Sequence, residues 1–141
     1  MHILVIHNYY REPGGEDAVF DAEVAVLREH DHQVSTYTDD NRNTASMSAL
    51  AGATDAIWSF RSAQEIGRLL KETKPDVVHI HNTFLRVSPS VYYTCQNAGV
   101  PVVQTLHNYR LLCPGANFFR NEHTCEDCLG KTVPWPGVVH G

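Results

Sequence analysis

Three short apolar segments of this chain each end in the dipeptide His-Asn. These dipeptides are His7-Asn8, His81-Asn82 and His107-Asn108. An imidazole can donate a hydrogen bond or stabilise a developing negative charge, and a carboxamide can orient a ligand hydroxyl. In an open parallel α/β sheet, ligands bind outside the carboxyl ends of the strands. We therefore predict that these side chains surround one cleft.

The candidate side chains differ in the strength of the case for a functional role. His107 follows a strand end and is our leading catalytic candidate, although a histidine there can also simply tie down its own loop. His81 is expected to border the cleft, whereas His79 lies inside its strand and is expected to be a structural histidine. The asparagines rank below His107, because Asn at a strand exit often bonds its own backbone.

A glycine-containing loop, Pro13-Gly14-Gly15-Glu16, joins the first strand to the first helix. Glycine permits a tight turn, and the exposed N–H groups at a helix start favour an anion such as phosphate. The loop lacks the Gly-x-Gly-x-x-Gly spacing and the P-loop lysine, which disfavours NAD and ATP sites. A glycine turn that binds no ligand is the alternative interpretation.

Three of the four cysteines, Cys113, Cys125 and Cys128, have the spacing of an incomplete zinc site. Two thiolates of a Cys-x-x-Cys pair converge on one tetrahedral ion, as in zinc ribbons. The fourth ligand could be His123, His140 or a residue beyond Gly141. The alternative is three buried or free thiols in a reduced protein. The fourth cysteine, Cys95, falls within a predicted helix and is expected to be a small core residue.

Composition narrows the class of protein. The chain has 141 residues, of which 43% are hydrophobic, which suits one globular domain. Its 11 basic and 16 acidic residues give a net charge of −5 with no basic block, so we expect no nucleic-acid partner. No apolar run approaches the roughly 20 residues that cross a bilayer, and no signal peptide is evident. We expect a soluble, cytoplasmic protein with reduced cysteines.

Alternating strands and helices must position these residues. Strands are expected at residues 2–6, 33–38, 55–58, 76–81 and 100–106, and helices at residues 16–28, 62–73 and 89–98. Ser62 begins a capping-box pattern, while Ser88, Pro89 and Gly99 mark the ends of the last helix. This order predicts an α/β fold with a Rossmann-like, doubly wound parallel sheet.

The connections and the C-terminal part are expected to be less regular. Residues 39–48 are polar and should form an exposed connection. After His107, residues 110–115 are expected to be irregular and residues 117–124 to form a hairpin. Residues 125–141 are rich in Pro and Gly, so the sequence predicts an irregular, cysteine-containing C-terminal segment without a final strand and helix.

Three segments of the sequence are similar to one enzyme family. They are the N-terminal segment through Pro13-Gly14-Gly15-Glu16-Asp17, residues 75–84 (PDVVHIHNTF) and residues 102–114 (VVQTLHNYRLLCP). They resemble the N-terminal domain of family 4 retaining glycosyltransferases, which have the GT-B fold. In that family, two Rossmann-like domains face each other; the N-terminal one mainly binds the acceptor and the C-terminal one holds the nucleotide-sugar. The resemblance implies that residues 1–141 are a truncated acceptor-side domain, with the donor-binding domain absent.

The resemblance also implies roles for the candidate residues. Gly14 and Gly15, with Glu16 beside them, would approach the donor phosphates, and His107 would lie near the transferred sugar. The remaining candidates for donor or acceptor binding are Asn8, His81, Asn82 and Asn108. The family needs no metal for catalysis, so zinc on the cysteines would be structural. Partners would be a nucleotide-sugar and a carbohydrate or lipid-linked acceptor, and the isolated chain is expected to be inactive.

Two other functions remain open from the residues alone. A Rossmann-like domain can bind a carbohydrate or nucleotide without catalysing a reaction, and a zinc-containing segment can be an interaction surface. Exposed basic and aromatic residues such as Arg86, Tyr92 and Trp135 would allow peripheral contact with a membrane carrying a lipid-linked acceptor.

Overall fold

The computed structural model describes residues 1–10, 14–41, 49–83 and 86–140. The chain folds into two compact units, Met1–Thr105 and Leu106–Gly141, which we describe separately. None of the helices in these ranges is long and apolar enough to cross a bilayer.

The first unit contains a four-stranded parallel sheet with the order β2-β1-β3-β4. The strands are β1 (His2–Tyr9), β2 (Gln33–Asp40), β3 (Val77–Ile80) and β4 (Val102–Gln104). Strand β1 lies in the interior, where it pairs with both β2 and β3. The parallel sheet predicted from the sequence is therefore confirmed.

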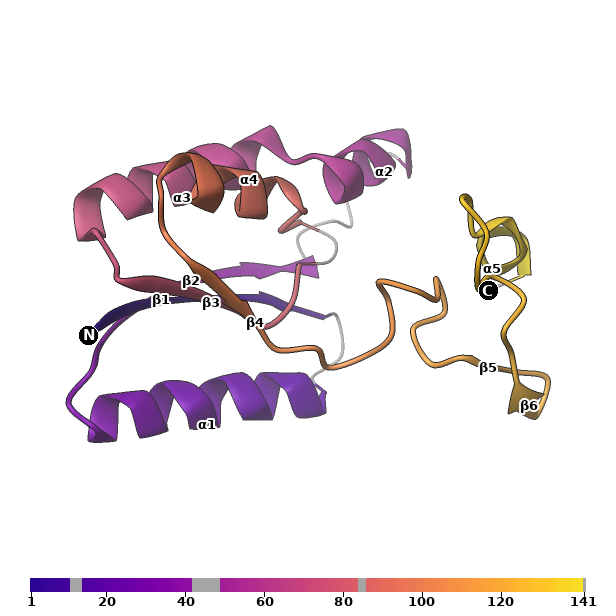
Figure 1. Ribbon diagram of the computed structural model, residues 1–141, viewed down its shortest axis with the longest axis horizontal. Coiled ribbons are helices and arrows are strands. Elements are labelled where there is room, and N and C mark those ends of the chain that lie inside the picture. The colour runs from indigo at the N-terminus through magenta and orange to yellow at the C-terminus, as the bar shows by residue number, and fades with distance from the viewer. Residues whose placement is uncertain (11–13, 42–48, 84–85, 141) are drawn as a thin grey trace. The chain divides into compact units, whose positions relative to one another are not determined.

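Helices cover both faces of this sheet (Figure 1). Helix α1 (Gly15–Glu29) lies on one face, and α3 (Phe60–Thr73) and α4 (Ser90–Asn97) lie on the other; α2 (Ala49–Ile57) precedes α3. This is the doubly wound arrangement expected from alternating strands and helices. Gly99 ends the α4 segment with a left-handed φ of 69°, as predicted from its place after the helix.

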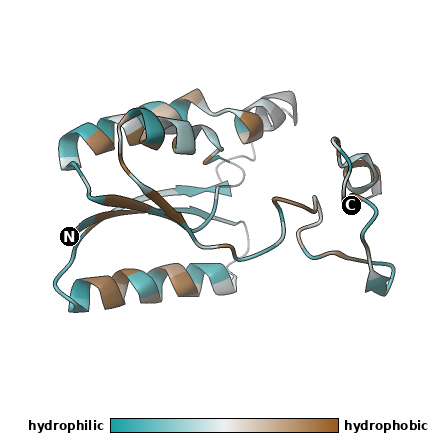
Figure 2. Cartoon of the chain, in the orientation of Figure 1, coloured by the Kyte–Doolittle hydropathy of each residue, from teal (hydrophilic) through white to brown (hydrophobic). Residues whose placement is uncertain are grey.

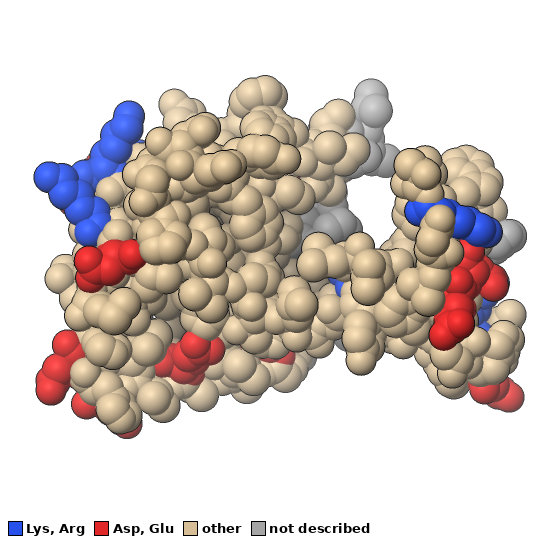
Figure 3. All heavy atoms as spheres, in the orientation of Figure 1, with Lys and Arg blue, Asp and Glu red and all other residues tan. Residues whose placement is uncertain are grey.

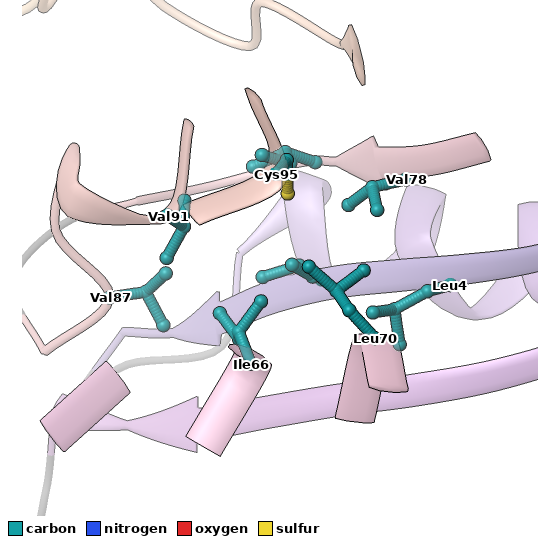
Figure 4. Close-up of a cluster of buried hydrophobic side chains, with 9 residues drawn as sticks. Leu4, Ile66, Leu70, Val78, Val87, Val91 and Cys95 are labelled. Atoms are coloured by element: carbon teal, nitrogen blue, oxygen red, sulfur yellow. The ribbon is translucent and has the colours of Figure 1, made fainter. Parts of the chain in front are cut away.

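Each face of the sheet has its own core because side chains alternate along β1. Leu4 and Ile6 face α3 and α4, whereas Ile3 and Val5 pack with Phe20 of α1. Figure 4 shows the larger core, where labelled side chains from the sheet and from α3 and α4 meet. Brown stretches of the sheet in Figure 2 mark the strands buried on both faces, whereas β2 is mostly teal.

Several predicted boundaries were wrong. Residues 55–58 form no strand: α2 covers Ala49–Ile57, whose Ala-rich sequence has a helix propensity that outweighed the short apolar run. Ser59, not Ser62, caps α3, and its side chain accepts the Ser62 N–H at 3.3 Å.

The other differences are shifts of element ends. Strands β3 and β4 are shorter than predicted, since each ends where its ladder to the neighbouring strand ends. Strand β2 extends through Asp40, so residues 39 and 40 are not part of a connection; residues 42–48 lie outside the described residues. Helix α4 begins one residue after the predicted Pro89, while the Ser88 side chain still accepts the Ser90 N–H.

The second unit has little regular structure. Strands β5 (Phe119–Arg120) and β6 (His123–Thr124) form the predicted hairpin, and α5 (Trp135–His140) is a short helix in a segment predicted to be irregular. On the face drawn in Figure 3, most side chains are neither acidic nor basic, and the basic ones of the first unit gather near the C-terminal end of α3.

Candidate functional site

The strand order of the sheet reverses between β1 and β3. The chain passes from β1 through α1 to β2 on one side, and the later strands β3 and β4 lie on the other side of β1. Ligands of doubly wound sheets bind outside the carboxyl ends of the strands at such a point. The edge where β1 and β3 end is therefore the candidate site.

Two of the three His-Asn dipeptides meet at this edge. The His81 N–H donates to the Ile6 carbonyl at 2.9 Å, which continues the β1–β3 ladder beyond β3. The Asn82 side-chain amide donates to the Asn8 carbonyl at 3.1 Å, and both asparagines are buried. Asn8 itself bonds its neighbour, the Tyr9 carbonyl, at 3.2 Å. The two strand exits thus form one hydrogen-bonded edge.

His7 connects this edge to the start of α1. Its ring is fully buried, stacks on Phe20 with ring centroids 4.8 Å apart, and places Nε2 2.7 Å from an Asp17 carboxylate oxygen. The second Asp17 oxygen accepts the Gly14 N–H at 2.9 Å. Nδ1 of His7 has no hydrogen-bond partner among the described residues. A carboxylate therefore already binds one of the amides at the helix start and orients the His7 ring.

A second carboxylate, Glu23, holds both histidines of the β3 segment. One Glu23 oxygen lies 2.9 Å from His79 Nδ1 and the other lies 3.3 Å from His81 Nε2. The opposite nitrogen of His79 lies 2.8 Å from the Thr105 hydroxyl. This geometry suits the structural role predicted for His79. His81 is 2% exposed, and its side chain lies against Glu23 of α1. At the edge of the sheet, His81 therefore contributes mainly its backbone.

Glu23, His79 and His81 are also the residues best placed to bind a metal ion. Within the part of the chain that the structure describes, only this group brings three candidate ligand atoms within 4.8 Å of one another. Two imidazoles and a carboxylate are suitable ligands for a divalent transition metal. In the structure, these same atoms lie in close contact with one another, and these contacts link α1 to the β3 segment.

The glycine loop has room beside it. Gly14 has an extended conformation, and a side chain at Gly15 would meet no atom within 4 Å. Neither residue has a positive φ, so the backbone conformation does not require glycine at these positions. The open space beside the loop would let a ligand approach the backbone closely. Phosphate binding at this loop stays a prediction. Glu16 is half-buried in the first turn of α1.

A further charged cluster lies at the carboxyl end of β2. Asp39 lies opposite Asn8 in the register of β1 and β2, and its side chain is 7% exposed. It accepts from Arg86 Nε at 2.9 Å and also pairs with Arg61. Arg86 was therefore wrongly predicted to be exposed.

The aromatic residues predicted to be exposed have different environments. Tyr92 is half-buried against the larger core and donates to the Gln104 side chain, so its predicted exposure was wrong. Its burial follows from its place on the sheet-facing part of α4. Trp135, in the second unit, is 66% exposed, as predicted.

The remaining candidates belong to the second unit. His107 is half-buried, and the Asn108 side chain accepts the Arg110 N–H at 3.0 Å, a turn-forming bond of the kind considered for strand-exit asparagines. Proximity of His107 to the glycine loop of the first unit stays a prediction. Cys113, Cys125 and Cys128 line one cavity and are free thiols. His123 is exposed on the hairpin, and the His140 side chain lies outside the described residues.

Sequence reasoning missed the two carboxylates that organise the edge. Asp17, Phe20 and Val24 form the buried stripe of α1, and Glu23 lies beside it. An acidic residue at a helical spacing from buried apolar residues is a signal of a buried polar partner. This signal was present in the sequence, but the partners of the two carboxylates could not be identified from α1 alone.

Comparison with known proteins agrees with this geometry. The family model for glycosyltransferase family 4 matches residues 13–124, which include the glycine loop, the β3 exit, His107 and the hairpin. No curated protein and no solved structure matches the chain. The parallel sheet with helices on both faces is the Rossmann-like half of a GT-B fold. The chain belongs to glycosyltransferase family 4 and forms its N-terminal domain.

Proposed function

We propose that this domain binds the acceptor in a glycosyltransferase that moves a sugar from a nucleotide-sugar donor with retention of configuration. The observation that carries the proposal is the family match over residues 13–124, which includes the glycine loop and the β3 exit described above. The acceptor is a saccharide, a lipid-linked sugar or a small hydroxyl compound. A second, donor-binding domain completes the enzyme.

The edge of β1 and β3 supplies the polar groups that such a domain needs. Asn8 and Asn82 present amide groups beside two backbone strand exits, and His81 places its backbone between them. Carbohydrate hydroxyls both donate and accept hydrogen bonds, so amide and carbonyl groups can orient them. These residues are our proposed acceptor contacts, together with Asn108.

The glycine loop and His107 are our proposed contacts to the reacting part of the donor. Amides at the start of α1 favour a diphosphate, and the open space at Gly15 admits it. His107 would donate a hydrogen bond to the transferred sugar or stabilise the negative charge on the leaving diphosphate. Closure of the two domains would exclude water, which otherwise intercepts the sugar. This chemistry needs no metal ion.

The test is a binding and turnover experiment with residues 1–141. Candidate acceptor glycosides and uridine diphosphate are titrated into labelled protein, and amide chemical shifts are followed by NMR. We expect acceptors to shift the resonances of residues 8 and 81–82, and we expect no sugar transfer. Asn82→Ala should weaken acceptor binding, whereas Asn97→Ala, at the exposed end of α4, should not.

Three results would contradict the proposal. Robust sugar transfer by residues 1–141 alone would refute the need for a separate donor-binding domain. Acceptor binding that Asn97→Ala and Asn82→Ala weaken equally would place the site away from the strand edge. A protein that binds sugar but shows no turnover even when joined to its donor domain would be a binding module.

The location of the enzyme follows from the same proposal. The four cysteines are too few and too unevenly spread for a small disulfide scaffold, and this pattern suits a reducing compartment. We therefore place the enzyme in the cytoplasm. Contact with a membrane-borne acceptor would use exposed aromatic residues such as Trp135.

A further inference from the structure

The second unit lacks a sufficient apolar core of its own. Among its described residues, Cys128 is the one buried hydrophobic residue, and large apolar side chains such as Leu111 and Trp135 are exposed. Its regular structure amounts to a short hairpin and the six-residue helix α5. Units shorter than about 40 residues usually need a metal ion, a disulfide or a partner to fold. Some stabilising element beyond apolar burial is therefore required.

Three cysteines of this unit surround one cavity. Cys113, Cys125 and Cys128 line a space of about 220 Å³. The chain packs tightly beside one of them: the Gly137 N–H donates to the Cys128 sulfur at 3.2 Å, and a side chain at Gly137 would lie 2.9 Å from the Pro114 ring and 3.0 Å from that sulfur. Glycine at this position allows the backbone to approach both the Pro114 ring and the sulfur.

The loop after Cys113 turns back toward Cys125. The Ala116 N–H donates to the Cys113 carbonyl at 2.8 Å, and the Cys125 N–H donates to the Phe118 carbonyl at 2.7 Å. Ala116 and Phe118 adopt left-handed φ values of 66° and 52°, which residues with a side chain adopt only at a cost in free energy. The loop thus accepts strain while it joins the segments that carry Cys113 and Cys125. Cysteine binds metals as the thiolate.

We propose that the thiolates of Cys113, Cys125 and Cys128 bind one zinc ion, which holds the second unit together. Zinc has Zn–S bonds of about 2.3 Å in tetrahedral sites, so ligand sulfurs lie roughly 3.8 Å apart. The three sulfurs do not all lie within 4.8 Å of one another in the structure. Zinc binding would draw them together and release the thiol protons to solvent.

This site differs from the cluster around Glu23. There, the Glu23 oxygens lie 2.9 and 3.3 Å from ring nitrogens of His79 and His81, and the second nitrogen of His79 lies 2.8 Å from the Thr105 hydroxyl. A metal ion would have to displace those contacts. Cys113, Cys125 and Cys128 instead line one cavity of about 220 Å³, where an ion has room beside the sulfurs. The thiols are therefore the better metal site.

The experiment measures metal binding by residues 1–141 under reducing conditions. Purified protein is analysed for zinc by mass spectrometry, and zinc-stripped protein is titrated with Co²⁺, whose thiolate charge-transfer and tetrahedral d–d absorption bands report the ligands. We expect one equivalent of zinc and a strong charge-transfer band. Cys125→Ser should weaken zinc binding by at least tenfold, while Cys95→Ala, in the core of the first unit, should retain one equivalent.

A second measurement does not depend on how the variants fold. Chelation of zinc from the wild-type chain should collapse the dispersed NMR resonances of residues 106–141 and leave those of residues 1–105, whose two apolar cores are independent of the cysteines of the second unit. Absence of stoichiometric zinc and of the cobalt charge-transfer band in reduced wild-type protein would overturn the proposal. So would a disulfide among these cysteines under the same conditions, or an unchanged spectrum after chelation.

Discussion

Replacement of Glu23 by Gln tests the link between α1 and the strand edge. One carboxylate oxygen lies 2.9 Å from His79 Nδ1 and the other lies 3.3 Å from His81 Nε2. A glutamine side chain has the same shape but carries no charge and offers one acceptor oxygen, so its amide group faces one of the two imidazoles as a donor. The interaction of a charged group with one buried ring is therefore lost.

The expected cost follows from these contacts. Hydrogen bonds to charged groups contribute about 1.5–3 kcal/mol. The Glu23 side chain is 33% exposed, so water screens it and the lower end of that range applies. We expect Glu23→Gln to lower the free energy of unfolding of the first unit by about 1.5–2 kcal/mol. With a urea dependence of about 2 kcal/mol per molar, the midpoint falls by roughly 1 M.

The assay is urea unfolding followed by Trp58 fluorescence in a Trp135→Phe background. Trp58 belongs to the first unit and Trp135 to the second, so the remaining tryptophan reports on the first unit alone. Glu29→Gln, at the exposed end of the same helix, is the matched control and should change the midpoint little. A midpoint for Glu23→Gln within error of that control would refute the reasoning.

Other predictions concern the glycine loop, the core and the thiols. Gly15→Ala should leave the urea midpoint unchanged, because the added Cβ meets no atom within 4 Å. Gly99→Ala should lower the free energy of unfolding by about 1 kcal/mol, because φ at Gly99 is +69°. Equal losses for the two variants would contradict this prediction. Ile66→Ala should lower the free energy of unfolding by about 2–5 kcal/mol in the same assay, and a loss below about 1 kcal/mol would show that the site is not well packed. In metal-free protein, Cys113 should react with iodoacetamide at lower pH than Cys95, because the pKa of Cys113 is lowered and burial raises that of Cys95 to about 11. Mass spectrometry of the labelled peptides measures both pH profiles, and the reverse order would contradict the assignment.

Much of the fold was visible in the sequence because it depends on local pattern. The apolar runs of β1 and β3 and the polar residues that follow them mark buried parallel strands and their exits. Gly99 after α4 and the hairpin after Asn117 were predicted from turn chemistry. Helix α2 was missed because a short apolar run does not by itself separate a strand from a buried helix.

The amino-acid sequence alone was enough to infer the family, the parallel sheet and the two His-Asn strand exits that meet at its edge. Only the tertiary structure showed that Glu23 joins His79 to His81, that Asp17 joins His7 to the start of α1, and that Arg86 pairs with Asp39. Periodicity along a segment reports which face is buried. The identity of a partner that lies many residues away depends on how α1 packs across the strands, and that is decided by the fold as a whole.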